Sequence, residues 1–349
     1  MSQIVTTGST SVEATFQMQA KNENRVPSWQ ESLRTAIRTS RELLAELGLP
    51  NSPLEESCEL DFPVFVPREF MLRMRRGDRN DPLLRQVLAA PEESLHVDGF
   101  SSDPVGDLTS QTQPGLLRKY RGRALMVLTG ACAVHCRYCF RRQYPYSLVP
   151  KSPLAWMPLI DEIKADETLE EIILSGGDPL MLPDASHAWL VNQVNQIPHV
   201  RRLRIHTRMP TIVPSRICPS LLEWLGAVRV PVFIVLHINH PRELDANVEQ
   251  SANALRLAGV TLLNQAVLLS GINDDPQVQF DLCEKLLDMQ ILPYYLHQLD
   301  RVDGAAHFEV PVDQGLRIIE FLRERLPGYG VPKYVREVAG ESHKRPLFH

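Results

Sequence analysis

The sequence predicts an α/β protein in which a helical N-terminal region precedes a partial (β/α)6 barrel. Six short apolar runs rich in β-branched residues lie between positions 123 and 298, separated by amphipathic stretches long enough for helices. After the first, the runs end at intervals of about 30 residues, the length of a strand with its crossover helix in a parallel βαβ unit. The hydrophobic share of 44% and the charged share of 23% are those of a globular protein.

The six predicted strands end at Thr129, Ser175, Thr207, His237, Val267 and Gln298. A partial barrel and a doubly wound open sheet both accommodate this series, whereas six units are too few to close a full barrel. No G-x-G-x-x-G follows the first run, which counts against the dinucleotide-binding form of the open sheet. Because functional groups collect at the carboxyl ends of parallel strands, we look for the chemistry at these ends.

We expect three segments along the chain, which are a helical region with a linker (1–115), the (β/α)6 core (116–341) and a short tail (342–349). Apolar side chains at helical spacing predict one helix that begins after Pro27 and ends near Gly48. Two more helices are predicted over 67–75 and 81–88. Residues 101–114 are rich in turn formers and are expected to form the linker.

Composition excludes several classes of protein. The chain carries 37 basic and 42 acidic residues, and a net charge of −5 gives it no general attraction for nucleic acid. No apolar run approaches the ~18 residues that span a bilayer, and the first residues lack the features of a signal peptide. Six cysteines are too few for a disulfide scaffold. We therefore expect a cytoplasmic protein without a nucleic-acid or membrane partner.

The strongest signal is a C-x3-C-x2-C motif formed by Cys132, Cys136 and Cys139, directly after the first predicted strand. Iron–sulfur cubanes are usually held by four thiolates, so three would leave one iron open for a substrate. A zinc site completed by His135 or by a distant residue is the alternative for this motif. Three ordinary buried cysteines on one short loop would be a costly coincidence.

This motif and its place after the first strand resemble the radical S-adenosylmethionine (SAM) superfamily. The resemblance implies a [4Fe–4S] cluster whose open iron binds SAM, which is then split into methionine and a 5′-deoxyadenosyl radical. Tyr138 and Phe140 flank the third cysteine, where the superfamily commonly places an aromatic residue near the adenine. The second strand ends in SGGDP, and the resemblance assigns Gly176, Gly177 and Asp178 to the SAM amino group. Glycine and aspartate would suit a plain turn equally well.

Further blocks between about residues 60 and 346 resemble the lysine 2,3-aminomutase family, among them CRYCFRR, LSGGDPL, HTRMPTIVPSRI, HINHPRE and LNQAVLLSGIND. The resemblance adds pyridoxal 5′-phosphate (PLP) as a cofactor, which stabilises the radical of the migrating amino group. It places PLP on Lys344 in SHKRP, with Lys119, Tyr120 and Arg123 around the phosphate and the ring. Taken alone, Lys344 would read as a solvated basic tail, and the basic cluster as a solvated surface.

The same resemblance assigns the remaining contacts with SAM and with the substrate to five residues. His237 and Gln265 would line the SAM pocket, although either could be a satisfied polar group of the core. Arg141 would bind the substrate carboxylate through a bidentate contact. Asp300 and Glu337 would bind the ε-ammonium of lysine, and Glu337 departs from the family, which has aspartate at that position.

CRYCFRR and the short segment after Lys344 resemble the family branch that serves translation elongation factor P. The resemblance implies conversion of (S)-α-lysine to (R)-β-lysine, which a separate ligase attaches to the factor. It also implies an external electron donor such as flavodoxin or ferredoxin.

Four other functions are the alternatives. They are a catabolic lysine 2,3-aminomutase, the same reaction on glutamate, a non-catalytic iron–sulfur or zinc module, and a radical SAM methyltransferase of nucleic acid. Two carboxylates in the site argue against glutamate, because they would repel an acidic side chain. A PLP lysine argues against a mere metal-binding module, and the acidic net charge argues against nucleic acid.

Overall fold

The computed structural model describes residues 27–50 and 62–348. Its strands form one ten-stranded sheet in which the spatial order follows the chain. The strands are β1 (Gln111–Gln113), β2 (Leu116–Leu117), β3 (Arg123–Val127), β4 (Glu171–Ser175), β5 (Arg202–Thr207), β6 (Val232–His237), β7 (Thr261–Val267), β8 (Leu292–His297), β9 (Lys333–Arg336) and β10 (Arg345–Pro346). Strands β3 to β9 are parallel, and β2 with β1 at one edge and β10 at the other add antiparallel pairs.

The six predicted strands are present as β3 to β8, which confirms a partial (β/α)6 barrel with crossover helices. A doubly wound sheet would reverse its strand order at a switch point, and this sheet does not. The sequence missed β9, a seventh parallel strand of only four residues. The sheet runs from residue 111 to 346 and so extends past the expected boundaries at 115 and 341. The three-segment division stays a prediction.

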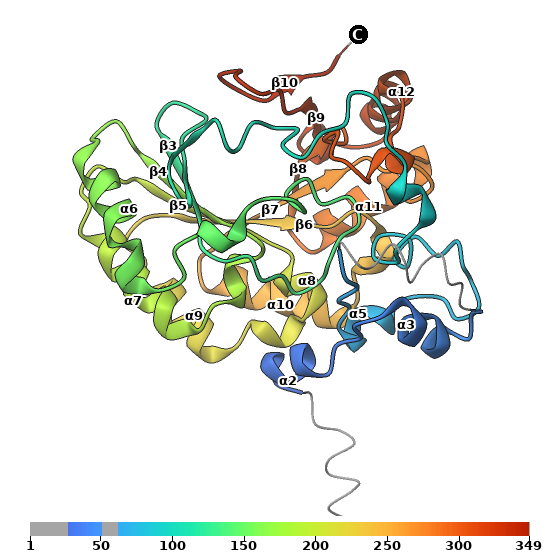
Figure 1. Cartoon of the computed structure of the whole chain (residues 1–349), viewed down its shortest axis with the longest axis horizontal. Helices are drawn as coiled ribbons and strands as arrows, with labels where there is room; N and C mark the ends of the chain where they lie inside the picture. The colour runs from blue at the N-terminus through green and yellow to red at the C-terminus, as the bar shows by residue number, and fades with distance from the viewer. Residues whose placement is uncertain (1–26, 51–61, 349) are drawn as a thin grey trace, which may run out of the picture.

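Helices follow the parallel strands and cover the outer side of the curved sheet, as Figure 1 shows. They are α6 (Pro153–Ala165), α7 (Asp184–Asn195), α8 (Met209–Ile212), α9 (Pro219–Gly226), α10 (Ala246–Leu257), α11 (Pro276–Asp288) and α12 (Val312–Arg323). Side-chain caps fix where several begin: Ser152 caps α6, Asp245 caps α10 and Asp275 caps α11. No helix of the described residues is long and apolar enough to cross a membrane.

Strand alternation decides which side chains face the helices and which face the concave side. In β5, Leu203 and Ile205 are buried in the apolar core that the strands share with the helices. The alternate residues Arg204 and His206 line the cavity on the opposite side. Successive strand residues point to opposite faces of a sheet, so this pattern follows from the sequence LRIHT.

The N-terminal helices differ from the prediction. The stretch expected as one helix from 27 to 48 is two helices, α2 (Trp29–Arg34) and α3 (Ser40–Leu47). The chain opens between them because the backbone of Ile37 pairs with Val66 in an antiparallel bridge. Of the helices predicted over 67–75 and 81–88, the first is only the single turn α5 (Arg68–Met71), and the second is a series of turns.

Candidate active site

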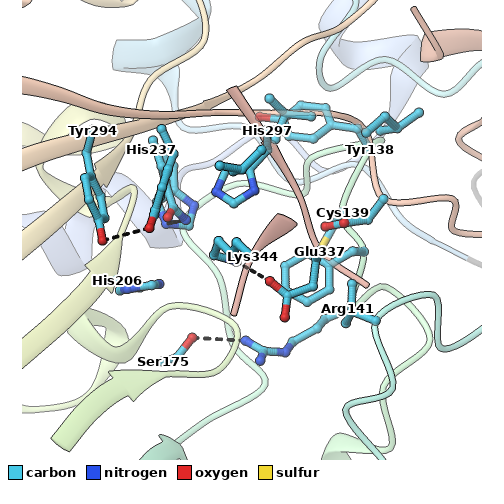
Figure 2. A pocket seen from close by; sticks show the side chains of 18 of the residues that line it. Tyr138, Cys139, Arg141, Ser175, His206, His237, Tyr294, His297, Glu337 and Lys344 are labelled. Atoms are coloured by element: carbon cyan, nitrogen blue, oxygen red, sulfur yellow. Dashed lines mark hydrogen bonds and ion pairs between the residues drawn. The ribbon is translucent and has the colours of Figure 1, made fainter. Parts of the chain in front are cut away.

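A cavity of about 1060 Å³ lies on the concave side of the sheet, and the structure brings all the predicted site residues to its wall. These residues are Lys119, Tyr120, Arg123, Cys132, Cys136, Cys139, Arg141, Gly176, Gly177, Asp178, His237, Gln265, Asp300, Glu337 and Lys344. Figure 2 shows side chains from several strands and from the C-terminal segment turned toward one space. The structure thus brings these residues together, and the role of each stays a prediction.

The three motif cysteines lie on the loop after β3 and all face the cavity. Burial raises the pKa of Cys132 well above its usual value, and the neighbouring Cys139 and Asp178 add to the rise. Burial likewise raises the pKa of Cys139 to about 11. In the protein alone, burial thus favours the protonated thiols of Cys132 and Cys139, and a bound metal would supply the charge that stabilises their thiolates.

His135, the residue that the zinc alternative would use, contacts residues that precede the cysteine loop. The Nδ1 atom of His135 lies 2.7 Å from the carbonyl oxygen of Pro63, and its ring stacks on Phe62 with centroids 5.1 Å apart. Among the described residues, no three side chains of His, Cys, Asp or Glu are grouped so that they could hold a metal ion. A cubane does not require the three sulfurs to meet at one metal ion, because each thiolate binds its own iron.

One cysteine already has a cationic donor, which the sequence did not single out. The Nη1 atom of Arg208 lies 2.7 Å from Sγ of Cys136 and 2.7 Å from the hydroxyl of Tyr138. Its Nη2 donates to Glu243 over 2.8 Å, so the guanidinium is neutralised where it is buried. Hydrogen bonds to cluster sulfurs are one means by which proteins set a cluster's potential.

Gly176 and Gly177 bring the loop after β4 onto the cysteine loop. Gly176 has φ +138°, and a Cβ there would lie 2.4 Å from the carbonyl oxygen of Thr129. A Cβ on Gly177 would lie 2.4 Å from the carbonyl oxygen of Ala131. The N–H groups of Gly177 and Asp178 donate to these same carbonyls over 2.7 Å. Only glycine permits this approach of the two loops.

The carboxylate of Asp178 is occupied by protein donors. Its oxygens accept hydrogen bonds from the hydroxyl of Thr207 and from the backbone N–H groups of Leu180, Arg208 and Met209. The side chain therefore ties the loop after β4 to the end of β5. The contact of Asp178 with the SAM amino group stays a prediction.

Histidines line the middle of the cavity. The β6–β7 register places His237 opposite Gln265, and their Nε2 atoms are 2.7 Å apart. Burial lowers the pKa of His237 to about 3, with Arg208 contributing, so the ring is neutral. The sequence missed His206 and His297, whose buried Nε2 atoms have no hydrogen-bond partner in the described part of the protein. Alternation along LRIHT would have indicated His206.

The sequence also missed Asp107, which comes from the segment expected to be a linker. Its carboxylate is buried and lies 2.6 Å from Nζ of Lys119 and 2.5 Å from Nε of Arg141. Burial alone would raise the pKa of Asp107, but the two cations lower it below its usual value. Arg141 also donates through Nη1 to the hydroxyl of Ser175 over 3.0 Å, a contact drawn in Figure 2.

Lys344 is not a solvated tail. The pairing of β10 with β9 carries it to the cavity, where it forms an ion pair with Glu337, as Figure 2 shows. The other oxygen of Glu337 accepts a hydrogen bond from the hydroxyl of Tyr120 and lies 3.8 Å from Nζ of Lys119. Although burial would raise the pKa of Glu337, Lys344 and Tyr120 lower it, so this carboxylate is ionised.

The two remaining predicted residues, Asp300 and Arg123, differ in the contacts that their side chains make. In the part of the chain that the structure describes, the carboxylate of Asp300 makes no hydrogen bond or ion pair. Burial raises its pKa to about 7, Lys344 opposes the rise, and Glu337 adds to it. Arg123 lies at the rim, where its Nε is 3.4 Å from Glu171 and its guanidinium lies over the ring of Tyr120.

Comparison with known proteins identifies the family. Residues 126–280 match the radical SAM superfamily. The chain is 42% identical over 319 residues to the L-lysine 2,3-aminomutase of Haemophilus influenzae and 43% identical over 322 residues to that of Escherichia coli, covering 91% of this chain and 94% of each relative. It is 32% identical to the L-lysine 2,3-aminomutase of Clostridium subterminale, over 91% of this chain and 77% of that protein. The chain therefore belongs to the L-lysine 2,3-aminomutase family of isomerases and contains a radical SAM domain.

Proposed function

We propose that this protein converts (S)-α-lysine to (R)-β-lysine with a [4Fe–4S] cluster, SAM and PLP. The observation that supports this most directly is the meeting of three elements in one cavity: the cysteine loop, Lys344 and the unpaired Asp300. An electron-transfer or zinc module would need only the first of them. This combination of a thiol triad, a lysine and a free carboxylate favours catalysis on an amino acid.

Cys132, Cys136 and Cys139 would hold the cluster, and the backbone of the glycine loop with His237 and Gln265 would contact SAM. The donor set fits, because all three thiols line one cavity and Arg208 donates to the sulfur of Cys136, a contact that would stabilise a thiolate there. When bound, the cluster and SAM would supply the radical that abstracts hydrogen. The protein's own part is to hold these groups together in one cavity on the concave side of the sheet.

Lys344 would hold PLP covalently, with Lys119 near the phosphate and Tyr120 near the ring. A phosphate requires cationic donors, and Lys119 faces the cavity within reach of the C-terminal segment. PLP would supply the conjugated system that stabilises a radical on the migrating amino group. Arg123 supports the phosphate less well, because it is half-exposed and faces Glu171.

Arg141 and Asp300 would bind the two ends of lysine. The guanidinium of Arg141 is buried and already oriented by two side chains, which suits a carboxylate. Among the described residues Asp300 has no partner, and it lies close enough to Lys344 to feel its charge, so a substrate ammonium could pair with it without breaking another contact there. Glu337 would be the second anion for the ammonium, once the ammonium has replaced Lys344 as its partner.

We infer that the β-lysine is made for modification of elongation factor P in the cytoplasm. The support is the resemblance of CRYCFRR and of the C-terminal segment to that branch of the family. A separate ligase would then transfer the product to the factor, and flavodoxin or ferredoxin would supply the electron. A catabolic lysine 2,3-aminomutase is the alternative, and the handedness of the product separates the two.

Anaerobic reconstitution with iron, sulfide and PLP tests the proposal directly. We expect absorbance from both a cluster and a bound PLP, and (R)-β-lysine on addition of (S)-α-lysine, SAM and a reductant. Borohydride reduction followed by peptide mapping should place the pyridoxyl group on Lys344, with Lys333, which also lines the cavity, as the internal control. A cluster without bound PLP, or a label on Lys333, would overturn the assignment.

A further inference from the structure

Asp107 is a buried carboxylate that the proposed reaction does not use, yet it touches two residues that the reaction does use. It pairs with Lys119 over 2.6 Å and with Arg141 over 2.5 Å. We propose that Asp107 is a positioning residue, which orients the guanidinium of Arg141 so that it can bind the substrate carboxylate. This inference rests on the proposed function, because it assumes that Arg141 meets an amino-acid carboxylate.

The hydrogen bonds of Arg141 leave one side of its guanidinium available. Nε donates to Asp107, Nη1 donates to Ser175 over 3.0 Å, and the guanidinium lies 4.8 Å from the centre of the Phe140 ring. Within the described residues, Nη2 makes no hydrogen bond. The group is thus fixed on three sides and can offer Nη2, with the second proton of Nη1, to a planar carboxylate.

The place of Asp107 is itself fixed by the loop that carries it. The carboxylate of Asp103 accepts the backbone N–H groups of Asp107 and Leu108 over 2.8 and 3.0 Å. Gly106 has φ +65°, and a Cβ there would lie 3.0 Å from Cβ of Ala339 in the C-terminal segment. The loop is therefore built against the segment that leads to Lys344, and its carboxylate has little freedom to move away from Arg141.

Two effects of this carboxylate on anion binding oppose each other. Its negative charge lowers the positive potential that an anion would meet at Arg141 and Lys119. Its hydrogen bond removes the rotational freedom that Arg141 would otherwise lose on binding. If orientation dominates, removing the charge weakens binding of a carboxylate, whereas if neutralisation dominates, removal strengthens it. The sign of the change decides between them.

The test compares lysine with 1,5-diaminopentane, which is lysine without its carboxylate. Each is titrated into the PLP-loaded protein without SAM, and binding is followed by the PLP absorption spectrum. We expect Asp107→Asn to weaken lysine binding several-fold, up to about ten-fold, because Arg141 would then lose rotational freedom on binding, and to leave diaminopentane binding unchanged. A disturbed Lys119 would instead change the binding of both amines alike.

Three further variants make the result specific. Ser175→Ala removes the second contact of Arg141 without removing a charge, and should lower the preference for lysine in the same direction. Asp107→Glu keeps the charge and should restore part of the preference. Asp166→Asn breaks a more exposed ion pair, with Arg118, outside the cavity and should change nothing.

The outcomes separate this inference from the proposed function. An unchanged or increased preference for lysine in Asp107→Asn would overturn the positioning role, while the wild-type response to lysine would still support the aminomutase. A wild-type protein whose PLP spectrum does not respond to lysine would overturn the proposed function and this inference with it. If Asp107→Asn does not fold, the Asp107→Glu titration decides the question, because this variant keeps the charge but displaces the carboxylate, and an unchanged preference for lysine would again overturn the positioning role.

Discussion

The two ends of the cavity are built by different means. At the cysteine end, formed by the loops after β3 and β4, backbone packs on backbone and only glycine fits at Gly176 and Gly177. At the charged end, formed by Asp107, Lys119, Glu337 and Lys344, buried ion pairs join segments that are distant in the sequence. Close backbone packing thus holds the cysteine end together, and ion pairs hold the charged end together.

This difference shows which residues are ready for a ligand. At the charged end Glu337 already has Lys344 as its partner, so a substrate ammonium must compete for it. Asp300 has no such partner among the described side chains, and burial raises its pKa. We therefore expect Asp300 to matter more than Glu337 for recognition of lysine, although the family resemblance gave both the same role.

The largest effect should come from the cysteine end. Changing Cys132, Cys136 or Cys139 to alanine should abolish cluster iron and formation of 5′-deoxyadenosine, because three thiolates are the fewest that hold a cubane with one open iron. Cys218→Ala is the matched control, since Cys218 is partly buried on the outer side of the sheet and contacts Asp184. Iron and sulfide analysis checks this, and a full cluster in any one of the three variants would refute the ligand set.

Asp300→Asn should have the next largest effect, now at the charged end. Loss of one charge-assisted contact to an ammonium, typically ~1.5–3 kcal/mol, should raise KM for lysine roughly 10- to 150-fold. The cluster should stay intact because the iron ligands lie on another loop. Lysine titrations and iron analysis of the same preparation check both statements. An unchanged KM would remove Asp300 from the substrate site.

The same variant should change the pH dependence of stability. Burial raises the pKa of Asp300 from 3.8 to about 7, so its protonated form favours folding below about pH 4 and this stability is lost as pH rises toward 7. Asp300→Asn should therefore be more stable than wild type at pH 8, by roughly one to a few kcal/mol, with a much smaller difference at pH 4. Urea unfolding at the two pH values measures it, and equal differences would contradict the raised pKa.

Gly177→Ala tests whether shape holds the cysteine end. The added methyl would overlap the carbonyl oxygen of Ala131, so unfolding should become easier by about 1–3 kcal/mol. At Gly226, the last residue of α9, a Cβ meets nothing within 4 Å, and alanine should be neutral or slightly stabilising. Thermal unfolding of both variants makes the comparison. Equal behaviour would mean that the two loops are not in close contact.

Glu337→Asp should give the smallest effect, but it tests directly whether Glu337 positions the substrate. It keeps the charge but withdraws the carboxylate from Lys344 and Tyr120, so activity should fall a few-fold or the product should change in handedness. Chiral analysis of the β-lysine checks this. A wild-type rate together with a wild-type product would show that Glu337 does not position the substrate.

Much of the fold was predictable because it depends on local pattern. The six runs that became β3 to β8 are apolar, evenly spaced and followed by amphipathic stretches. The strand β9 was missed because four residues, KYVR, carry no periodic signal. The helix expected over 27–48 was wrong in its middle because Ile37 pairs with a residue 29 positions later, a tertiary contact that helical spacing cannot show.

The site divides in the same way. The cysteine motif and SGGDP could be predicted from spacing, because each is short and lies at the end of one strand. Lys344 and Glu337 could be predicted only from the family resemblance, because nothing in the local sequence distinguishes them from residues of a solvated surface segment. Asp107 gave no signal at all, because its segment has the composition of a linker and its partners Lys119 and Arg141 are identified only by the fold.

The hydrogen bond between Tyr120 and Glu337 joins residues 217 positions apart. Neighbouring parallel strands can pair as each unit is synthesised, but this contact cannot form until the last strands are complete. Competence to bind a ligand at the charged end is thus one of the last properties the chain acquires as it folds. A molecule bound between Lys119 and Lys344 would bridge the first and last parts of the sheet. At one hundred times its Kd it would stabilise the whole chain by about 2.7 kcal/mol, so cofactor supply and the lifetime of the folded protein are thermodynamically linked.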